Sequence, residues 1–206
     1  MAVTGRKRRW LRRAFVSLVL FLAVCIAVFF ALPRLLIAPM NAARSDVILH
    51  VAIDPHSKAD DYVAHLYRQG MAGKIVCISS QVSWEVYPAD YVREHVISLG
   101  APAENVTTLH LPLVPCAGVA VPMIAEFVKA RGWKSALLIC QPEDSRYAGW
   151  MAGRIFEQAG IDLSVSYAPE DKEELMQAWW RTHWKVQRFV GKAMNIALDL
   201  FYSECR

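Results

Sequence analysis

Residues 46–53 read Asp-Val-Ile-Leu-His-Val-Ala-Ile, a short, mostly apolar run that is typical of a strand buried on both faces of a sheet. Four further runs of this kind lie at 74–79, 105–111, 135–140 and 163–168. Helical patterns separate the runs, at 59–69, 89–99, 121–129 and 145–158. Strands that alternate with single helices form parallel βαβ units with right-handed crossovers. The sequence therefore predicts an α/β fold, a three-layer Rossmann-like domain of about five mainly parallel strands.

Upstream of the first strand, residues 14–32 form a run without charge, which at about 1.5 Å per residue spans roughly 28 Å, close to the thickness of a bilayer core. Six basic residues precede the run: Arg6, Lys7, Arg8, Arg9, Arg12 and Arg13. Because positive charge stays on the cytoplasmic side, we expect the N-terminus inside and the main domain outside. The expected organisation is a basic cytoplasmic segment at 1–13, one N-terminal transmembrane helix at 14–37, a tether at 38–45 and an extracytoplasmic domain at 46–206.

Two other interpretations of the apolar run stay open, a cleaved signal peptide and a buried helix of a soluble protein. The apolar core of a signal peptide is usually about 7–15 residues long and is followed by a small-x-small cleavage site. This run is longer, and Asn41-Ala42-Ala43-Arg44 matches such a site poorly. An uncleaved anchor is therefore the favoured interpretation, with the lipid bilayer as the partner of residues 14–37.

The charge of the chain is unevenly distributed. The net charge is +4, yet beyond residue 37 there are 16 Lys and Arg against 19 Asp and Glu. The basic charge is therefore a topology signal, and a nucleic acid partner is not expected. Of the five cysteines, none has a CxxC or Cys/His spacing, so no metal site is predicted. Cys116 and Cys140 are the only pair considered for a disulfide; otherwise the cysteines are free thiols.

Candidate functional residues follow the carboxyl ends of the predicted strands, where open parallel sheets bind ligands. The candidate acid and base residues are Asp54, His56 and Asp144. The candidate ligand-binding residues are Lys58, Ser79, Ser80, Gln81, Gln141 and Arg146. The competing interpretation of the acidic residues Asp60, Asp61, Glu143 and Asp144 is capping and dipole compensation at helix starts. No dinucleotide, P-loop or nucleophile-elbow motif occurs, so no cofactor is assigned.

The last part of the chain, residues 173–202, has a helical pattern and contains Trp179, Trp180 and Trp184. These indoles suit a lid, a lipid-facing belt or a saccharide platform. They equally suit packing of the last helix on the sheet. The two histidines inside strand patterns, His50 and His110, are expected in the core or at a sheet edge.

Several segments together resemble the DUF218 family, also called YdcF-like, SanA-like or ElyC-like. They are Leu66-Tyr67-Arg68-Gln69-Gly70, the stretch Leu99-Gly100-Ala101-Pro102-Ala103-Glu104-Asn105-Val106, and Trp179-Trp180-Arg181. The similarity covers roughly residues 45–204. It implies a pocket over the strand ends and a role in the bacterial envelope, linked in some members to peptidoglycan, lipid carrier or surface polysaccharide metabolism. The chain departs from the family at polar pocket positions, since the glycine pair after the second strand falls near Ser79-Ser80-Gln81.

Two functions follow from the residues and the resemblance. The first is a binding or assembly factor for the cell envelope, anchored in the bacterial inner membrane. The alternative is an enzyme that acts on a phosphorylated or glycosylated envelope precursor, with Asp54, His56, Asp144 and Arg146 in its pocket.

Overall fold

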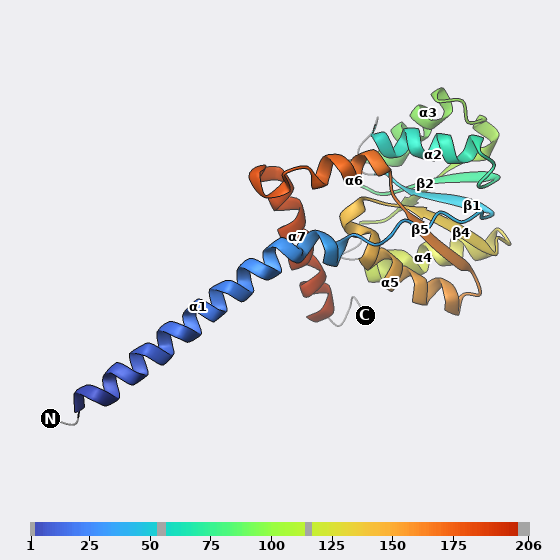
Figure 1. The fold of residues 1–206 in the computed structure, drawn as a ribbon. Coiled ribbons are helices and arrows are strands. Elements are labelled where there is room, and N and C mark those ends of the chain that lie inside the picture. The colour runs from blue at the N-terminus through green and yellow to red at the C-terminus, as the bar shows by residue number, and fades with distance from the viewer. Residues whose placement is uncertain (1–2, 53–56, 114–116, 202–206) are drawn as a thin grey trace.

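The computed structural model describes residues 3–52, 57–113 and 117–201. Its centre is a five-stranded, all-parallel sheet with the strand order β3-β2-β1-β4-β5, which confirms the predicted α/β fold (Figure 1). The strands are β1 (Val47–Val51), β2 (Lys74–Ser80), β3 (Val106–Leu111), β4 (Ser135–Ile139) and β5 (Asp162–Ser166). Strand β1 is central and pairs with β2 on one side and β4 on the other. The strand order reverses beside β1, and this is the place where such sheets bind ligands.

Helices cover both faces of the sheet, as the alternating pattern predicts. The four covering helices are α2 (Lys58–Arg68), α3 (Pro88–Ser98), α4 (Ala117–Ala130) and α5 (Ser145–Gln158). Successive side chains of β1 point to opposite faces. Ile48 packs in the core under α2 and α3, whereas Val47 and Leu49 pack in the core under α4 and α5. Both cores are apolar and closed, so ligand chemistry is confined to the ends of the strands.

The C-terminal region differs from the single helical remainder that the sequence predicts. Helix α6 (Pro169–Met176) ends before a short 3-10 turn at Trp179–Arg181, and α7 (His183–Phe201) follows. The break comes at Ala178, whose backbone is left-handed with φ of 45°. This turn directs Trp179 into a third apolar cluster, where it packs against Phe189 at 5.0 Å between ring centroids. Burial of the indole explains a break that helix propensity alone does not predict.

Helix α1 (Val3–Leu36) is a single 34-residue helix that projects from the domain (Figure 1). Its segment from Trp10 to Leu36 is 27 residues long, apolar enough to cross a membrane, and unburied in its most apolar window. This exposure rules against a buried helix of a soluble core. By length and composition, the helix is compatible with a single membrane anchor or a signal sequence.

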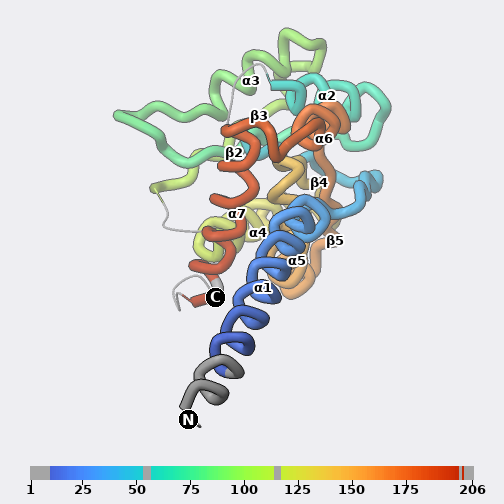
Figure 2. The backbone as a smooth tube through the Cα atoms, turned by 60° about the vertical axis from the view of Figure 1, so that its left-hand side comes forward, coloured from blue at the N-terminus to red at the C-terminus, as the bar shows by residue number. Residues whose placement is uncertain are grey.

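The connection from α1 to the sheet packs on the domain rather than hanging free. Leu36 and Ile37 are buried in the third apolar cluster with Tyr167 and Phe189. Beyond them, the amide of Ala38 donates a hydrogen bond to Ser145 Oγ at 2.9 Å, and Tyr167 Oη donates to the Ala38 carbonyl at 2.9 Å. Figure 2 shows α1 leaving the domain beside α5 and α7. The segment predicted as a tether therefore fixes α1 to the domain.

Candidate functional site

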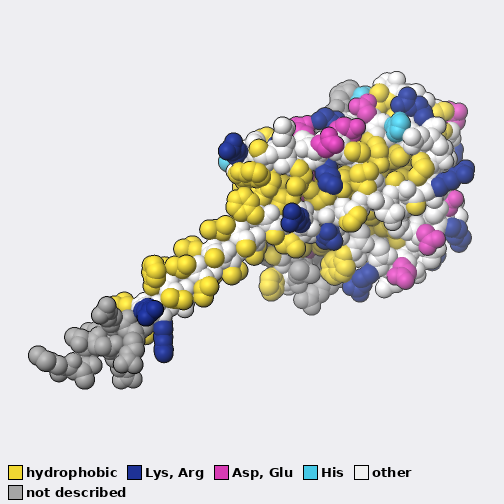
Figure 3. Space-filling model, viewed as in Figure 1, with side chains coloured by type: hydrophobic (Ala, Val, Ile, Leu, Met, Phe, Trp, Pro, Cys, Tyr) yellow, Lys and Arg dark blue, Asp and Glu magenta, His cyan; other side chains and the backbone are white. Residues whose placement is uncertain are grey.

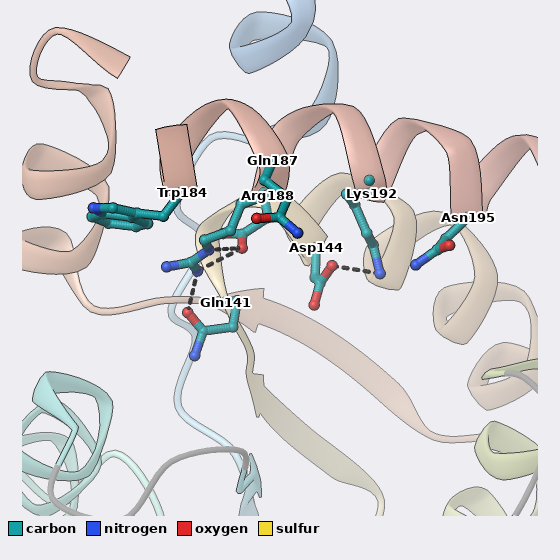
Figure 4. Close-up of a pocket in the computed structure, with 9 residues that line it drawn as sticks. Gln141, Asp144, Trp184, Gln187, Arg188, Lys192 and Asn195 are labelled. Carbon is teal, nitrogen blue, oxygen red and sulfur yellow. Dashed lines mark hydrogen bonds and ion pairs between the residues drawn. The ribbon is translucent and has the colours of Figure 1, made fainter. Parts of the chain in front are cut away.

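A cavity of about 590 Å³ lies between the loop after β4 and helix α7 (Figure 4). The loop comes from the carboxyl end of β4, next to the reversal of strand order. The cavity is lined by Gln141, Glu143, Asp144, Trp184, Gln187, Arg188, Gly191, Lys192 and Asn195. Its position agrees with the general rule for ligand sites in open parallel sheets.

Two charge pairs join the loop to α7. Arg188 Nε donates to Glu143 Oε1 at 2.6 Å, and Arg188 Nη2 donates to Gln141 Oε1 at 2.8 Å. Lys192 Nζ lies 2.5 Å from Asp144 Oδ1. Arg188 and Lys192 are four residues apart and therefore project from the same side of the helix, as Figure 4 shows. The positive and negative charges of the cavity are thus balanced in pairs.

Glu143 pairs with Arg188 through only one of its two carboxylate oxygens. Its side chain is almost fully buried, with 6 % of the residue exposed, and its Oε2 atom has no hydrogen-bond partner. Burial raises the pKa of Glu143 above its usual value, although the neighbouring Arg188 guanidinium acts in the opposite direction. An unpartnered buried carboxylate oxygen is costly. The atom is closed off from the open cavity in this structure, so a ligand donor reaches it only when the β4 loop or Arg188 shifts. A protonated Glu143 would itself be a donor.

The remaining cavity wall is polar and aromatic. Gln187 and Asn195 bring amide groups from α7, and the indole of Trp184 closes one end (Figure 4). The Arg188 guanidinium carbon lies 5.7 Å from the centroid of the Trp184 ring, within range of a cation–π contact. The cavity therefore offers donors, acceptors and one flat apolar surface.

The structure places only some of the predicted site residues in this cavity. Gln141 and Asp144 line it. Arg146 turns away, because its Nη2 donates to the carbonyls of Arg34 at 3.1 Å and Ile37 at 3.0 Å. Lys58 pairs with Glu174 and lines a separate cavity of about 440 Å³ beside α2.

Of the three residues predicted after the second strand, Ser79 and Ser80 are the last residues of β2, and Gln81 begins the connection to α3. Ser79 Oγ accepts a hydrogen bond from the backbone amide of Ala89 at 3.0 Å. The amide of Gln81 donates to the Leu111 carbonyl at 3.3 Å, and Ser80 is the last residue of β2. None of the three is among the residues that line the cavity under α7.

Three predicted residues lie outside the described residues: Asp54, His56 and Cys116. The expectation that Asp54 and Asp144 meet in one pocket therefore stays a prediction. Cys140, the other cysteine of the pair considered, is a free, buried thiol whose pKa is raised by burial.

The contribution of α7 to the cavity was not predicted from the sequence. Trp184, Arg188 and Lys192 recur at intervals of four residues, which is the spacing of side chains on one helix face. That spacing was the one feature of the sequence from which a shared helix face could have been predicted. Nothing in the sequence indicates that this face meets the β4 loop, because the pairing depends on where the turn after α6 directs α7.

A second acidic residue, Asp60 of α2, forms a buried cluster with side chains from β1 and α3. His50 Nε2 donates to Asp60 Oδ1 at 2.7 Å, and His95 Nδ1 donates to Asp60 Oδ2 at 2.8 Å. Ser57 Oγ donates to Asp60 Oδ1 at 3.1 Å. Burial opposes ionisation of Asp60, but hydrogen bonds from His50, His95 and Ser57 outweigh it and hold the pKa below its usual value. This cluster links β1, α2 and α3.

Within the described ranges, no group of three or more His, Cys, Asp or Glu side chains is arranged to hold a metal ion. No model of a known protein family matches the chain, and no curated protein matches it. Fold and site define the chain as a parallel α/β domain with a strand-end pocket, joined to a helix long and apolar enough to span a membrane.

Proposed function

We propose that the protein is a binding or assembly factor of the bacterial cell envelope, anchored by α1 in the inner membrane with its N-terminus inside. Its α/β domain lies outside, and the cavity under α7 receives the hydroxyl-rich part of a glycosylated precursor. The observation that carries this proposal is the buried, unpartnered Oε2 of Glu143 in the cavity wall. The missing partner is a hydrogen-bond donor. A sugar hydroxyl supplies it once the β4 loop or Arg188 shifts to uncover this oxygen.

The other groups of the cavity favour a neutral sugar over a phosphate. Arg188 and Lys192 are already paired with Glu143 and Asp144, so no cation is left over for an additional anion among the described residues that line the cavity. Amide side chains exchange two hydrogen bonds with a ligand, and an indole offers a face on which an apolar side of a sugar ring stacks. This combination matches saccharide recognition in a concave site with a few polar groups.

Two features support the anchor over a cleaved signal. Cleavage near residue 43 would remove Leu36 and Ile37 from the third apolar cluster and expose Phe189. It would also remove the carbonyls of Arg34 and Ile37 that accept hydrogen bonds from Arg146. The basic block before α1 favours an inside N-terminus, and the resemblance to the YdcF-like family supports the envelope role.

The test is calorimetric titration of the full chain in detergent with neutral and N-acetylated mono- and disaccharides. Inorganic phosphate serves as the anion comparison. We expect at least one sugar to bind, Glu143→Gln to weaken it by about tenfold or more, and phosphate to show no heat. Glu94→Gln is the matched control, because Glu94 is exposed on α3. Phosphate binding with no sugar binding would overturn the saccharide proposal.

One observation favours the alternative, an enzyme. The raised pKa of Glu143 beside Asp144 resembles the environment of a general acid, which must hold its proton near neutral pH. In a binding factor, a saccharide recovered after incubation with the protein is chemically unchanged. In an enzyme, Glu143→Gln retains binding and loses turnover, and mass spectrometry of the recovered saccharide distinguishes the two outcomes.

A further inference from the structure

The length of the apolar segment places the junction of α1 and the domain at the membrane surface. Residues 14–33 are free of charge and, as a helix, span about 30 Å, the thickness of a bilayer core. Phe29 and Phe30 lie inside this stretch, about one turn from its outer end. Yet the domain already contacts them, because Phe29 lies 4.7 Å from Trp179 and Phe30 lies 5.9 Å from Trp180 between ring centroids.

This overlap means that the part of the domain around Trp180 meets the bilayer. Trp179 is buried between α1 and Phe189, but Trp180 is 49 % exposed at the level of Phe30. Tryptophan is enriched at membrane interfaces, where its ring is apolar and its N–H remains hydrated. Trp10 lies near the opposite end of the same apolar segment.

Helix α7 extends the apolar surface away from α1. Figure 1 shows α7 crossing the last turns of α1, and Val186 and Ile196 pack against the cluster that contains Leu36. Three other apolar residues of α7, Met194, Leu198 and Phe201, are exposed. Figure 3 shows hydrophobic side chains continuing from α1 onto the domain around the junction, with basic side chains among them. Exposed apolar groups of this kind mark a contact surface.

We propose that Trp180, Met194, Leu198 and Phe201 form a second membrane contact, the junction surface, which rests in the outer interfacial layer of the bilayer. The partner is the lipid interface itself. The inference rests on the anchor in the proposed function and is independent of the ligand of the cavity. Helix α7 then acts as an interfacial helix that orients the domain, with Trp184 at the boundary between lipid and cavity.

The hydrogen bonds at the junction favour a fixed orientation of the domain relative to α1 over a freely moving domain. Arg146 binds the last carbonyls of α1, and Ser145 and Tyr167 bind the backbone at Ala38. These contacts fix the direction in which the anchor leaves the domain. The opening of the cavity under α7 is therefore held close to the headgroups, where a membrane-linked ligand would present its polar part.

The test is spin labelling of the full chain in nanodiscs of phosphatidylethanolamine and phosphatidylglycerol. One cysteine at a time is introduced at Leu198, at Val19 in the middle of α1 or at Leu113, in a chain whose Cys25, Cys116 and Cys205 are serine. Cys77 and Cys140 are retained because both are buried. All three label sites are exposed, so the labels leave the cores intact. Leu113 is the matched control, an exposed leucine on the loop after β3.

We expect the label at residue 198 to collide more with oxygen and several-fold less with a water-soluble nickel chelate than the label at residue 113. The label at residue 19 should show the deepest position. Equal nickel access at 198 and 113, with 19 in lipid, would overturn the junction surface alone. Nickel access at residue 19 would overturn the anchor as well.

Discussion

Two acidic residues, Asp60 and Glu143, lie at helix starts that follow neighbouring strands, and their surroundings differ in one respect. Both are almost fully buried, and both contact cationic or imidazole partners. Both carboxylate oxygens of Asp60 have hydrogen-bond partners, and its pKa is lowered. Glu143 has one oxygen without a partner, and its pKa is raised. The bonds of Asp60 join β1, α2 and α3, whereas Glu143 keeps one buried acceptor without a partner. In the Asp60 cluster, the atom without a partner is His50 Nδ1, which is not on the carboxylate.

The comparison shows that complete hydrogen bonding, more than burial, separates a structural carboxylate from a functional one. A buried group whose bonds are all made stabilises the elements that it joins. A buried group with a free acceptor costs stability, and such groups concentrate at functional sites. Four measurements test this distinction.

The largest effect is expected from Asp60→Asn. The amide keeps the shape but removes the charge and places N–H donors against the donating nitrogen of His50 or His95. Breaking a buried charged network of this kind costs about 3–5 kcal/mol. Thermal unfolding of the full chain in detergent should show a melting temperature lower by roughly 10 °C. Asp61→Asn on the same helix turn is the control, and because Asp61 is exposed its effect should stay within about 0.5 kcal/mol.

The contributions of Asp60 and Glu143 to the free energy of unfolding should change with pH in opposite directions. The folded pKa of Asp60 lies below its unfolded value, so its contribution is present above about pH 4 and is lost as the pH falls further. The folded pKa of Glu143 lies above its unfolded value of about 4.3. Its contribution is therefore full below about pH 4.3 and is lost as the pH rises through the folded pKa.

We would compare the melting temperatures of the wild type and Glu143→Gln from neutral to acid pH. The difference isolates the contribution of Glu143 to the pH dependence of stability. Relative to the variant, the wild type should gain stability as the pH falls toward 4.3. Parallel curves would show that Glu143 is fully compensated in the folded protein, and the contrast with Asp60 would then fail.

At neutral pH, Glu143→Gln itself should change stability little. The substitution removes a buried charge that lacks one partner, while Arg188 keeps Gln141 and partial contact with solvent. We expect a change within about 1 kcal/mol, neutral or stabilising, measured as for Asp60→Asn. A loss as large as that of Asp60→Asn would mean that Glu143 is a structural residue and would remove the main support for a ligand site.

The sequence predicted the fold well because the apolar runs and the helices between them are local patterns. The layers follow from them through general rules of chain topology. The strand order β3-β2-β1-β4-β5 was not predicted and comes from the structure. The candidate site was predicted only in part. Gln141 and Asp144 were found because strand ends are recognisable in the sequence. Arg188 was missed because its contact with Glu143 spans 45 residues and depends on the turn at Ala178.

The same limit explains Arg146 and Asp60. Arg146 was predicted as a ligand-binding residue from its place at a strand end, but its bonds go to the carbonyls of α1. Whether an acidic residue at a helix start is a cap, a core ion or a ligand group depends on partners from distant segments. The partners of Asp60 are His50 from β1 and His95 from α3, and no local sequence pattern predicts these contacts.

The smallest effect is expected from Lys192→Gln, which breaks the ion pair with Asp144 across the cavity. Both side chains are about a quarter exposed, at 23 % and 26 %, so water screens the pair. Such pairs contribute about 0.2–1 kcal/mol, and the melting temperature should fall by no more than roughly 3 °C. The expected result means that α7 is held by the apolar cluster around Phe189 and that the ion pair with Asp144 contributes little to the fold. A loss of several kcal/mol would show instead that the Asp144 pair resembles the Asp60 cluster and is part of the fold.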